Sequence, residues 1–393
     1  MISVAEAQAR LLALASPLPS IELELAKATR HYLHGPLVAK RTQPAADLSA
    51  MDGYAVSSAE FPGPWQVIGE SAAGRPFAGK LNAGEAVRIF TGAQVPAGAD
   101  AILIQEDAAR IGNQLLANND NALPFGRHIR KAGSDFSAGD NILDTGKLLE
   151  AGPIALAAMA GHGTVRAGRW PRVTIIATGD ELMPAGAECS AAHIPSSNSP
   201  MLHAMLSGLP CEIVDGGIIR DNLAELESKL RSLAQAADII VTTGGASVGD
   251  HDLVQTALLN IGAEMDFWKV AMRPGKPIMA GKIGNSVVLG LPGNPSSAFV
   301  TAFLFLLPIV RHFAGALSPL PEIFEARIAT ELAAGGSRTE YLRSKVEYGV
   351  ITPFRSQDSG MVLPLSQSNA LIIHDANAPA KPAGAAVHYH RIA

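Results

Sequence analysis

Three stretches of the sequence place small residues, hydroxyls and acids directly after an apolar run. They are 174–182 (TIIATGDEL), 238–252 (DIIVTTGGASVGDHD) and 287–297 (VVLGLPGNPSS). Each predicts a strand that stops at glycine and a helix that starts shortly afterwards, so free N–H groups and positive helix-dipole ends would meet at one edge of a sheet. Such an edge suits a phosphate or another anion.

The second stretch has the barest backbone of the three. Thr243 can donate a hydroxyl hydrogen bond to a ligand. Three glycines permit positive φ and the close approach of a ligand: Gly244, Gly245 and Gly249. The spacing matches neither the GxxxxGK(S/T) phosphate loop nor the GxGxxG dinucleotide fingerprint. An ordinary strand-to-helix turn with Asp250 as the helix N-cap is an equally good interpretation.

Two cations lie between prolines in the segment 272–281 (MRPGKPIMAG). Arg273 and Lys276 on such a rigid loop suit a phosphate or an oxyanion, which arginine can bind through two parallel hydrogen bonds. A proline-rich surface turn with solvated charges is the alternative. The sequence LPGNPSS at 291–297 likewise predicts either a turn with a serine N-cap or a rigid wall beside a ligand.

Carboxylates form the other half of the candidate chemistry. Glu181 and Asp250 follow neighbouring expected strands, whereas Asp52 (in MDGYA) and Asp135 (in GSD) lie in a different part of the chain. Mg²⁺ takes one or two carboxylates together with phosphate oxygens. A carboxylate can instead accept two parallel hydrogen bonds from the edge of a pterin or guanine ring. For Asp52 alone, an Asp-Gly turn is the simpler interpretation.

The elements that must position these residues follow from periodicity. Expected strands alternate with helices from residue 172 onwards, which predicts a mostly parallel sheet whose ligands bind at the carboxyl ends of the strands. Short β-like runs separated by Gly, Pro and Asn predict a β-rich domain over 38–139. Helical spacing before and after it, over 1–37 and 140–169, makes that domain an insertion. After residue 318 short β-like runs again predict strands.

Composition limits the class of protein. The chain has 393 residues, enough for two to four domains, and a formal net charge of -5, which provides no overall field for nucleic acid or an anionic membrane. Its two cysteines, Cys189 and Cys211, exclude a disulfide framework and suit a reducing cytosol. The apolar run 298–310 is shorter than the ~20 residues that a bilayer requires. We therefore expect a cytoplasmic protein without a membrane span.

Together the motifs resemble the molybdopterin molybdenumtransferases, the bacterial MoeA type, and the E domain of gephyrin. The matching stretches occur in the family's order along almost the whole chain: SAMDGYAV (49–56), TGAQVPAGADAIL (91–103), IRKAGSDFSAGD (129–140), TGDEL (178–182), SNSPML (197–202), TGGASVGDHD (243–252), AMRPGKP (271–277) and GLPGNPSSA (290–298). This chain departs from the family at Ser134, where an acidic residue is common, and Arg338 and Arg343 match only loosely.

The resemblance implies a multidomain α/β architecture. A helical dimerisation region would come from 1–37 and 140–169, an inserted β-rich domain from 38–139, a molybdopterin-binding α/β domain with a mostly parallel sheet from 170–317, and a C-terminal β-barrel from 318–393. It also implies a homodimer whose cleft lies between the α/β domain of one subunit and the inserted domain of the other.

The family's reaction inserts molybdate into adenylated molybdopterin and releases AMP, with Mg²⁺ as the cofactor. The adenylyltransferase of the preceding step would be a further partner. Carried over by position, the catalytic residues would be Asp52, Asp135, Glu181 and Asp250, with Glu181 and Asp250 on the metal. Substrate would contact Thr91, Thr243, Gly244, Gly245, Ser247, Gly249, Arg273, Lys276, Pro292, Gly293, Asn294, Pro295 and Ser296.

Two other functions compete with this one. A molybdopterin adenylyltransferase would use the same α/β domain, but the inserted β domain and the dimerisation region argue against it. A non-catalytic scaffold like gephyrin would have no need to keep acids at Asp52, Asp135, Glu181 and Asp250.

Overall fold

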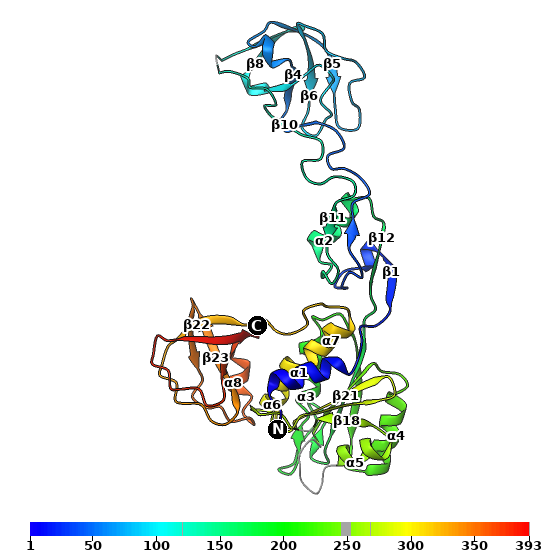
Figure 1. The fold of residues 1–393 in the computed structure, drawn as a ribbon, viewed down its shortest axis with the longest axis vertical. Coiled ribbons are helices and arrows are strands. Elements are labelled where there is room, and N and C mark those ends of the chain that lie inside the picture. Colours follow the sequence, from blue (N-terminus) through cyan, green and yellow to red (C-terminus); the bar gives the residue numbers. More distant parts are fainter. Residues whose placement is uncertain (120, 245–252, 268, 393) are drawn as a thin grey trace.

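The computed structural model describes residues 1–119, 121–244, 253–267 and 269–392. The molecule is elongated (Figure 1). An α/β domain and a C-terminal barrel lie side by side at one end, a narrow stalk (residues 20–39 and 139–168) leads away from them, and the inserted β domain lies at the far end.

The α/β domain is built on a six-stranded sheet. Its strand order is β16 (Glu212–Ile219), β13 (Arg172–Thr178), β17 (Ile239–Thr243), β21 (Ser286–Leu291), β20 (Met279–Ile283) and β18 (Glu264–Phe267). The first four strands are parallel, whereas β20 and β18 add antiparallel pairs at one edge. The carboxyl ends of β13, β17 and β21 therefore lie together at one end of the strands, as the sequence predicts.

Helices cover both faces of this sheet. Alternate residues of β17 show the period of two: Ile239 and Val241 pack into one core cluster, and Ile240 packs into the other. The first face is covered by α1 (Val4–Ala13), α3 (Asn198–Leu206) and a long helix made of α6 (Pro295–Thr301), a π-helical segment (Ala302–Leu306) and α7 (Leu307–Phe313). The second face is covered by α4 (Leu223–Leu233) and α5 (Leu253–Asn260).

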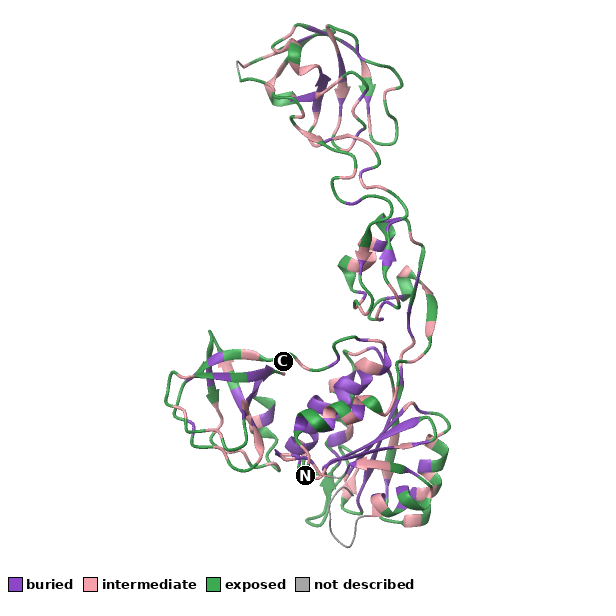
Figure 2. Cartoon of the chain, viewed as in Figure 1, coloured by how far each residue is buried: buried purple, intermediate pink, exposed green. Residues whose placement is uncertain are grey.

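The long helix Pro295–Phe313 is the one helix in the described ranges that is long and apolar enough to cross a membrane. Of its most apolar window, 83% is buried inside the protein. Figure 2 shows it as a buried rod beside the central strands. Its hydropathy is explained by its place in the core of the α/β domain.

The expectation of a helical region over 1–37 is wrong in two respects. Helix α1 packs into the α/β core through Val4, Ala7 and Leu11, so it does not belong to the stalk. Residues 20–37 are not a helix: β1 (Ser20–Glu24) pairs with β12 (Thr164–Gly168), and only one 3-10 turn follows. Apolar and acidic residues alternate with a period of two in SIELE, and this pattern outweighs the helix propensity of Leu and Glu.

The rest of the stalk is equally poor in helix. β2 (Leu37–Val38) pairs with β11 (Asn141–Leu143), and α2 (Ala151–Met159) is the α-helix of this region. A small apolar cluster around Leu33, Leu149 and Val165 holds these pieces together. The stalk is therefore a thin β structure with a single short helix on its side.

The inserted domain is β-rich, as predicted. Its six strands are ordered β7 (Ala101–Ile104), β4 (Gly53–Val56), β6 (Glu85–Ile89), β5 (Trp65–Ser71), β9 (Gln114–Ala117) and β8 (Ala108–Ile111). Trp65 and Leu115 are fully buried in its core. A pair of short strands, β3 (Leu48–Ser49) and β10 (Ile129–Arg130), closes its base toward the stalk.

The predicted C-terminal barrel is confirmed. Five strands pair in a closed ring: β23 (Thr339–Glu347), β24 (Val350–Pro353), β22 (Phe324–Ile328), β26 (Ala386–Arg391), β25 (Ala370–His374) and back to β23. A short strand of the α/β domain, β19 (Met272–Arg273), pairs with the start of β23. This pairing places the Arg273 loop directly beside the barrel.

Candidate functional site

A cavity of about 920 Å³ opens at the carboxyl ends of β13, β17 and β21. Its wall comes from eight segments that are separate in sequence: 178–182 without Asp180, 194–198, Asp221, 243–244, 273–277, 292–297 without Ser296, Arg338, and 357–359 of the barrel. The α/β domain supplies the floor and the barrel supplies one side. The edge predicted from the three glycine-ended strands is therefore a real concavity.

Two glycines are required by the geometry of this edge. Gly244 has a φ of +87°, and a Cβ atom there would collide with the carbonyl oxygen of Thr178. Gly179 has a φ of +147°, and a Cβ atom there would collide with the Glu181 carboxylate, which folds back over the end of β13. The strand ends thus approach one another more closely than any side chain would allow.

Three cations line the cavity: Arg273, Lys276 and Arg338. Arg273 donates to the Glu340 carboxylate at 3.1 Å, a pair that β19 brings to the barrel, and its side chain stays largely exposed. Lys276 has no ion-pair partner among the residues that the structure describes. These groups leave positive charge available to an anionic ligand.

Acids face the same space. Glu181, one of the predicted site residues, lines the cavity together with Asp221 and Asp358, which no sequence motif marks. The Asp180 carboxylate accepts from the Asp221 amide at 3.2 Å and thereby ties the end of β13 to the segment after β16. In the described ranges, no three His, Cys, Asp or Glu residues stand close enough to hold a metal by themselves.

The barrel reaches the cavity through a loop, residues 356–361, that Arg343 holds in place. The Arg343 guanidinium is only 1% exposed, and it donates to Ser296 Oγ at 2.7 Å and to the carbonyl oxygens of Met361 and Asp358 at 2.8 Å each. Burial lowers the pKa of Arg343. Asn294 Nδ2 donates to Ser359 Oγ at 3.0 Å, which joins the loop to the start of α6.

Ser296 has a different place from the one predicted. It is fully buried beneath the cavity wall, where its hydroxyl donates to the Met361 carbonyl at 2.8 Å and accepts from Arg343. Pro292, Gly293, Asn294 and Pro295 do line the cavity. Ser296 therefore stabilises the 356–361 loop from below and does not form part of the cavity surface.

Asp52 and Thr91 form a pair in the inserted domain, at the other end of the molecule from the cavity. The Asp52 carboxylate accepts from the Thr91 amide at 2.7 Å and from the Thr91 hydroxyl at 2.8 Å. These bonds, the amide first, lower the pKa of Asp52 and keep it ionised. Within one chain, neither residue lines the cavity.

Asp135 occupies a third place. It is exposed between the inserted domain and the stalk, beside a shallow hollow that Asp140 and Leu156 also line. Gly245, Ser247, Gly249 and Asp250 lie outside the described residues, so the position of these predicted site residues is not given by the structure. Thr243 and Gly244, which precede them, line the cavity.

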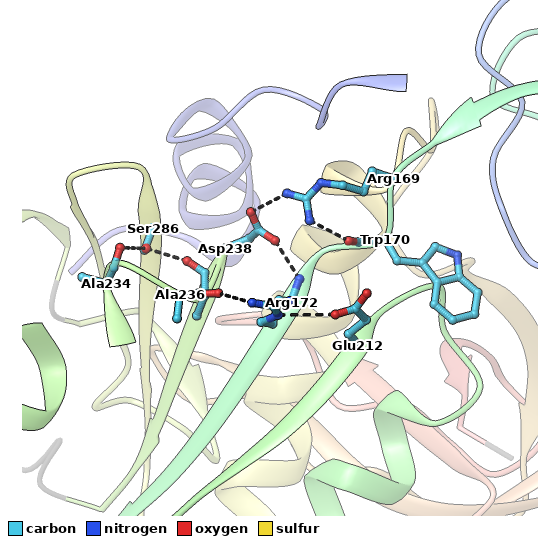
Figure 3. A network of polar contacts seen from close by, with 9 residues as sticks. Arg169, Trp170, Arg172, Glu212, Ala234, Ala236, Asp238 and Ser286 are labelled. Atoms are coloured by element: carbon cyan, nitrogen blue, oxygen red, sulfur yellow. Dashed lines mark hydrogen bonds and ion pairs between the residues drawn. The ribbon is translucent and has the colours of Figure 1, made fainter. Parts of the chain in front are cut away.

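A polar network joins the amino ends of the central strands, at the opposite end from the cavity (Figure 3). The Asp238 carboxylate accepts from Arg169 at 2.8 Å and from the Arg172 amide at 2.7 Å, which ties the starts of β17 and β13 together. Arg172 also donates to the Ala236 carbonyl and to Glu212. Because these side chains satisfy the amino ends of the strands, the carboxyl ends are the edge that stays open to ligands.

Comparisons with known proteins agree with this architecture. Three family descriptions match consecutive regions: "MoeA N-terminal region (domain I and II)" over residues 2–161, "Probable molybdopterin binding domain" over 174–312, and "MoeA C-terminal region (domain IV)" over 325–392. The α/β domain with its cavity is therefore that of a molybdopterin-binding protein of molybdenum cofactor biosynthesis.

Individual relatives show which kind of molybdopterin-binding protein the chain resembles. The chain is 34% identical to the molybdopterin molybdenumtransferase of Haemophilus influenzae over 324 residues, which is 80% of this chain and 78% of that protein. It is 32% identical to the enzyme of that name from Staphylococcus aureus (strain MSSA476) over 388 residues, 95% of this chain and 91% of that protein. A crystal structure of the molybdopterin biosynthesis MoeA protein from Pyrococcus horikoshii superposes with a TM-score of 0.82 at 25% identity, covering 100% and 99% of the two chains.

The chain belongs to the molybdopterin molybdenumtransferase family, the MoeA proteins. The family resemblance and the transferase class inferred from the sequence are confirmed, as is the assignment to molybdenum cofactor biosynthesis.

Proposed function

We propose that this protein inserts molybdate into adenylated molybdopterin and releases AMP. The observation that carries the proposal is the cavity, in which Arg273, Lys276 and Arg338 converge with bare strand ends in the molybdopterin-binding domain. Molybdate is a dianion and the adenylated substrate carries a phosphoanhydride. Bringing two anions together requires fixed cations and N–H dipoles in a site partly shielded from water.

We propose Mg²⁺ as the cofactor, held by acids of this cavity. Glu181 and Asp221 are two carboxylates on the wall, and Mg²⁺ uses one or two carboxylates and completes its shell with water and phosphate oxygens. We place it on these residues together with Asp250. When bound, the ion would neutralise the phosphate charge of the leaving group. Without it, the two carboxylates would repel an incoming anhydride.

A homodimer would complete the site. Helix α2 has the sequence AGPIALAAM, yet Ala157 is its one buried residue and Met159 is 48% exposed. Val38, on the neighbouring strand β2, is also exposed. A second copy of the chain packed on this apolar face would bury it. It would also allow the Asp52–Thr91 pair of one subunit to reach the cavity of the other, which a single elongated chain does not permit.

Molybdate-dependent AMP release tests the proposal. Purified protein is incubated with adenylated molybdopterin, Mg²⁺ and molybdate, and AMP is separated by chromatography. Glu181→Gln should lower the rate by about 100-fold or more, because it removes a charge where the reaction develops charge. Glu227→Gln, on the surface of α4, is the matched control and should leave the rate unchanged.

Two results would contradict the proposal. The first is AMP release that is equally fast without molybdate. The second is production of adenylated molybdopterin by this protein alone from molybdopterin and ATP, which would indicate the adenylyltransferase of the preceding step.

A further inference from the structure

The amide of Asn198 contains a buried acceptor without a donor. Asn198 is the first residue of α3, is 8% exposed and lies in the wall of the cavity. Its Nδ2 donates to the Gly293 carbonyl at 2.8 Å. Its Oδ1 is fully buried and has no hydrogen-bond partner in the described structure. Because only the NH₂ group can donate to Gly293, the amide orientation is fixed and the oxygen is the unpaired atom.

An unpaired buried carbonyl is costly, and native proteins seldom keep one unless water or a ligand supplies the donor. The neighbouring cap gives no help, since the Ser197 side chain makes no capping hydrogen bond to α3. Asn198 Nδ2 and Gly293 together also join the start of α3 to the loop after β21. The oxygen therefore belongs to a fixed amide of a residue that lines the cavity, and it lacks a donor in the described structure.

The surface beside Asn198 is apolar and differs from the cationic part of the wall. Leu182 pairs with Ile194 between the short strands β14 (Leu182–Met183) and β15 (Ile194–Pro195), and both residues line the cavity with Pro195. Ile194 is exposed there. The chain then runs through Ser196 and Ser197 into Asn198. The cations come from other segments, the 273–277 loop and the barrel.

An apolar surface next to a single fixed acceptor suits a flat nitrogen heterocycle. The ring faces would lie against Leu182, Ile194 and Pro195, and an N–H at the ring edge would meet the oxygen. The exocyclic NH₂ group is a donor that the adenine of a nucleotide and a pterin both carry.

We infer that Asn198 Oδ1 accepts a hydrogen bond from the exocyclic amino group of the bound heterocycle and thereby determines which heterocycle the cavity selects. The inference rests on the proposed function, because adenylated molybdopterin contains both an adenine and a pterin. It adds a specificity determinant in the SNSP segment of the cavity wall.

Matched pairs of small ligands test the inference by isothermal titration. The first pair is AMP and purine riboside 5′-monophosphate, which lacks the amino group. The second pair is pterin-6-carboxylate and its lumazine counterpart, which has an oxo group in place of the amino group. The wild-type protein should bind the amino member of one pair about 5- to 30-fold more tightly, since its partner leaves the buried oxygen unpaired. The pair that shows the preference identifies the ring.

Three variants test whether the preference for the amino-bearing ligand depends on Asn198. In Asn198→Ala the ratio of affinities should fall to about 1, since no acceptor remains. Asn198→Asp keeps an acceptor oxygen but cannot donate to the Gly293 carbonyl, so a preference retained in this variant would support the acceptor role directly. Asn260→Ala, an exposed amide on α5, should match the wild type. If the alanine variant unfolds, the comparison within each ligand pair on the wild-type protein still tests the inference.

Equal binding within both pairs by the wild-type protein, or a preference that survives in Asn198→Ala, overturns the inference. Molybdate-dependent AMP release accompanied by equal binding refutes the role of Asn198 alone. A clear preference without AMP release refutes the proposed reaction alone.

Discussion

Replacing Arg343 by methionine should loosen the barrel loop that lines the cavity. The guanidinium donates to four acceptors: Ser296 Oγ and the carbonyl oxygens of Ser356, Asp358 and Met361. Hydrogen bonds from a charged donor contribute roughly 1.5–3 kcal/mol each. Removing a buried charge also removes its desolvation penalty, which amounts to several kcal/mol. The net loss of stability should therefore be about 2–4 kcal/mol.

The effect should be local. The bonds between Gln357 and the Arg343 backbone do not depend on the side chain and remain in the variant. The loop would keep the Gln357 bonds and lose those of the Arg343 side chain. Gln357, Asp358 and Ser359 would therefore line the cavity for less of the time. Substrate affinity should fall before the barrel itself unfolds.

Two measurements check this expectation. Urea unfolding followed through the barrel gives the change in stability, and amide hydrogen exchange at residues 356–361 and at Ser296, whose N–H donates to the Ser359 carbonyl at 3.1 Å, gives the local opening. Arg327→Met is the control, because Arg327 makes one side-chain hydrogen bond from the exposed face of the same barrel. The reasoning is refuted if exchange at 356–361 is no faster in Arg343→Met than in Arg327→Met.

Three further predictions follow from other parts of the structure. Gly244→Ala should cost about 2 kcal/mol or more in thermal unfolding and also weaken ligand binding, because the methyl group meets the Thr178 carbonyl at a positive φ; an unchanged melting temperature would contradict it. Burial lowers the pKa of His390, whose ring packs against Phe303 and Tyr341. The neutral ring therefore contributes stability above its ordinary pKa of ~6.5, and this contribution is lost as the pH falls below that value; melting temperatures at pH 7.5 and pH 5 should differ less in His390→Gln than in the wild type. Met159→Asp on α2 should shift the protein toward monomer in sedimentation velocity and lower AMP release, and an unchanged dimer would argue against the apolar face of α2 as the subunit contact.

Local pattern was sufficient for most of the α/β domain. The apolar runs within 172–178, 239–243 and 286–291 are buried strands of one sheet, and Glu181, Arg273 and Lys276 line the cavity at its carboxyl ends. Glu181 follows a strand end, so a periodicity argument reaches it, whereas Arg273 and Lys276 are marked by the prolines that flank them. Asp221 also follows a strand, but ordinary helix-start residues surround it, and nothing local marks it as part of a cavity.

The contribution of the barrel could not be predicted in the same way. Gln357, Asp358 and Ser359 look like any polar turn, and they reach the cavity only because Arg343 is buried and because β19 pairs with β23. Such contacts depend on how two domains dock, which the hydrophobic period of either one does not encode. The position of α1 could not be predicted for the same reason. Its amphipathic pattern predicts a helix with one buried face, but it does not show which domain packs against that face.

The docking of α1 has a consequence for the order in which the chain can fold as it is made. Gln8 Nε2 donates to the Leu304 carbonyl at 2.9 Å, across a separation of 296 residues. At the usual rate of synthesis, α1 leaves the ribosome on the order of 15–60 s before its partner helix exists. During that time the stalk and the inserted domain can form, while the apolar face of α1 waits uncovered. The first helix made is thus among the last to be buried, and an N-terminal fragment that stops before residue 295 should be prone to aggregation.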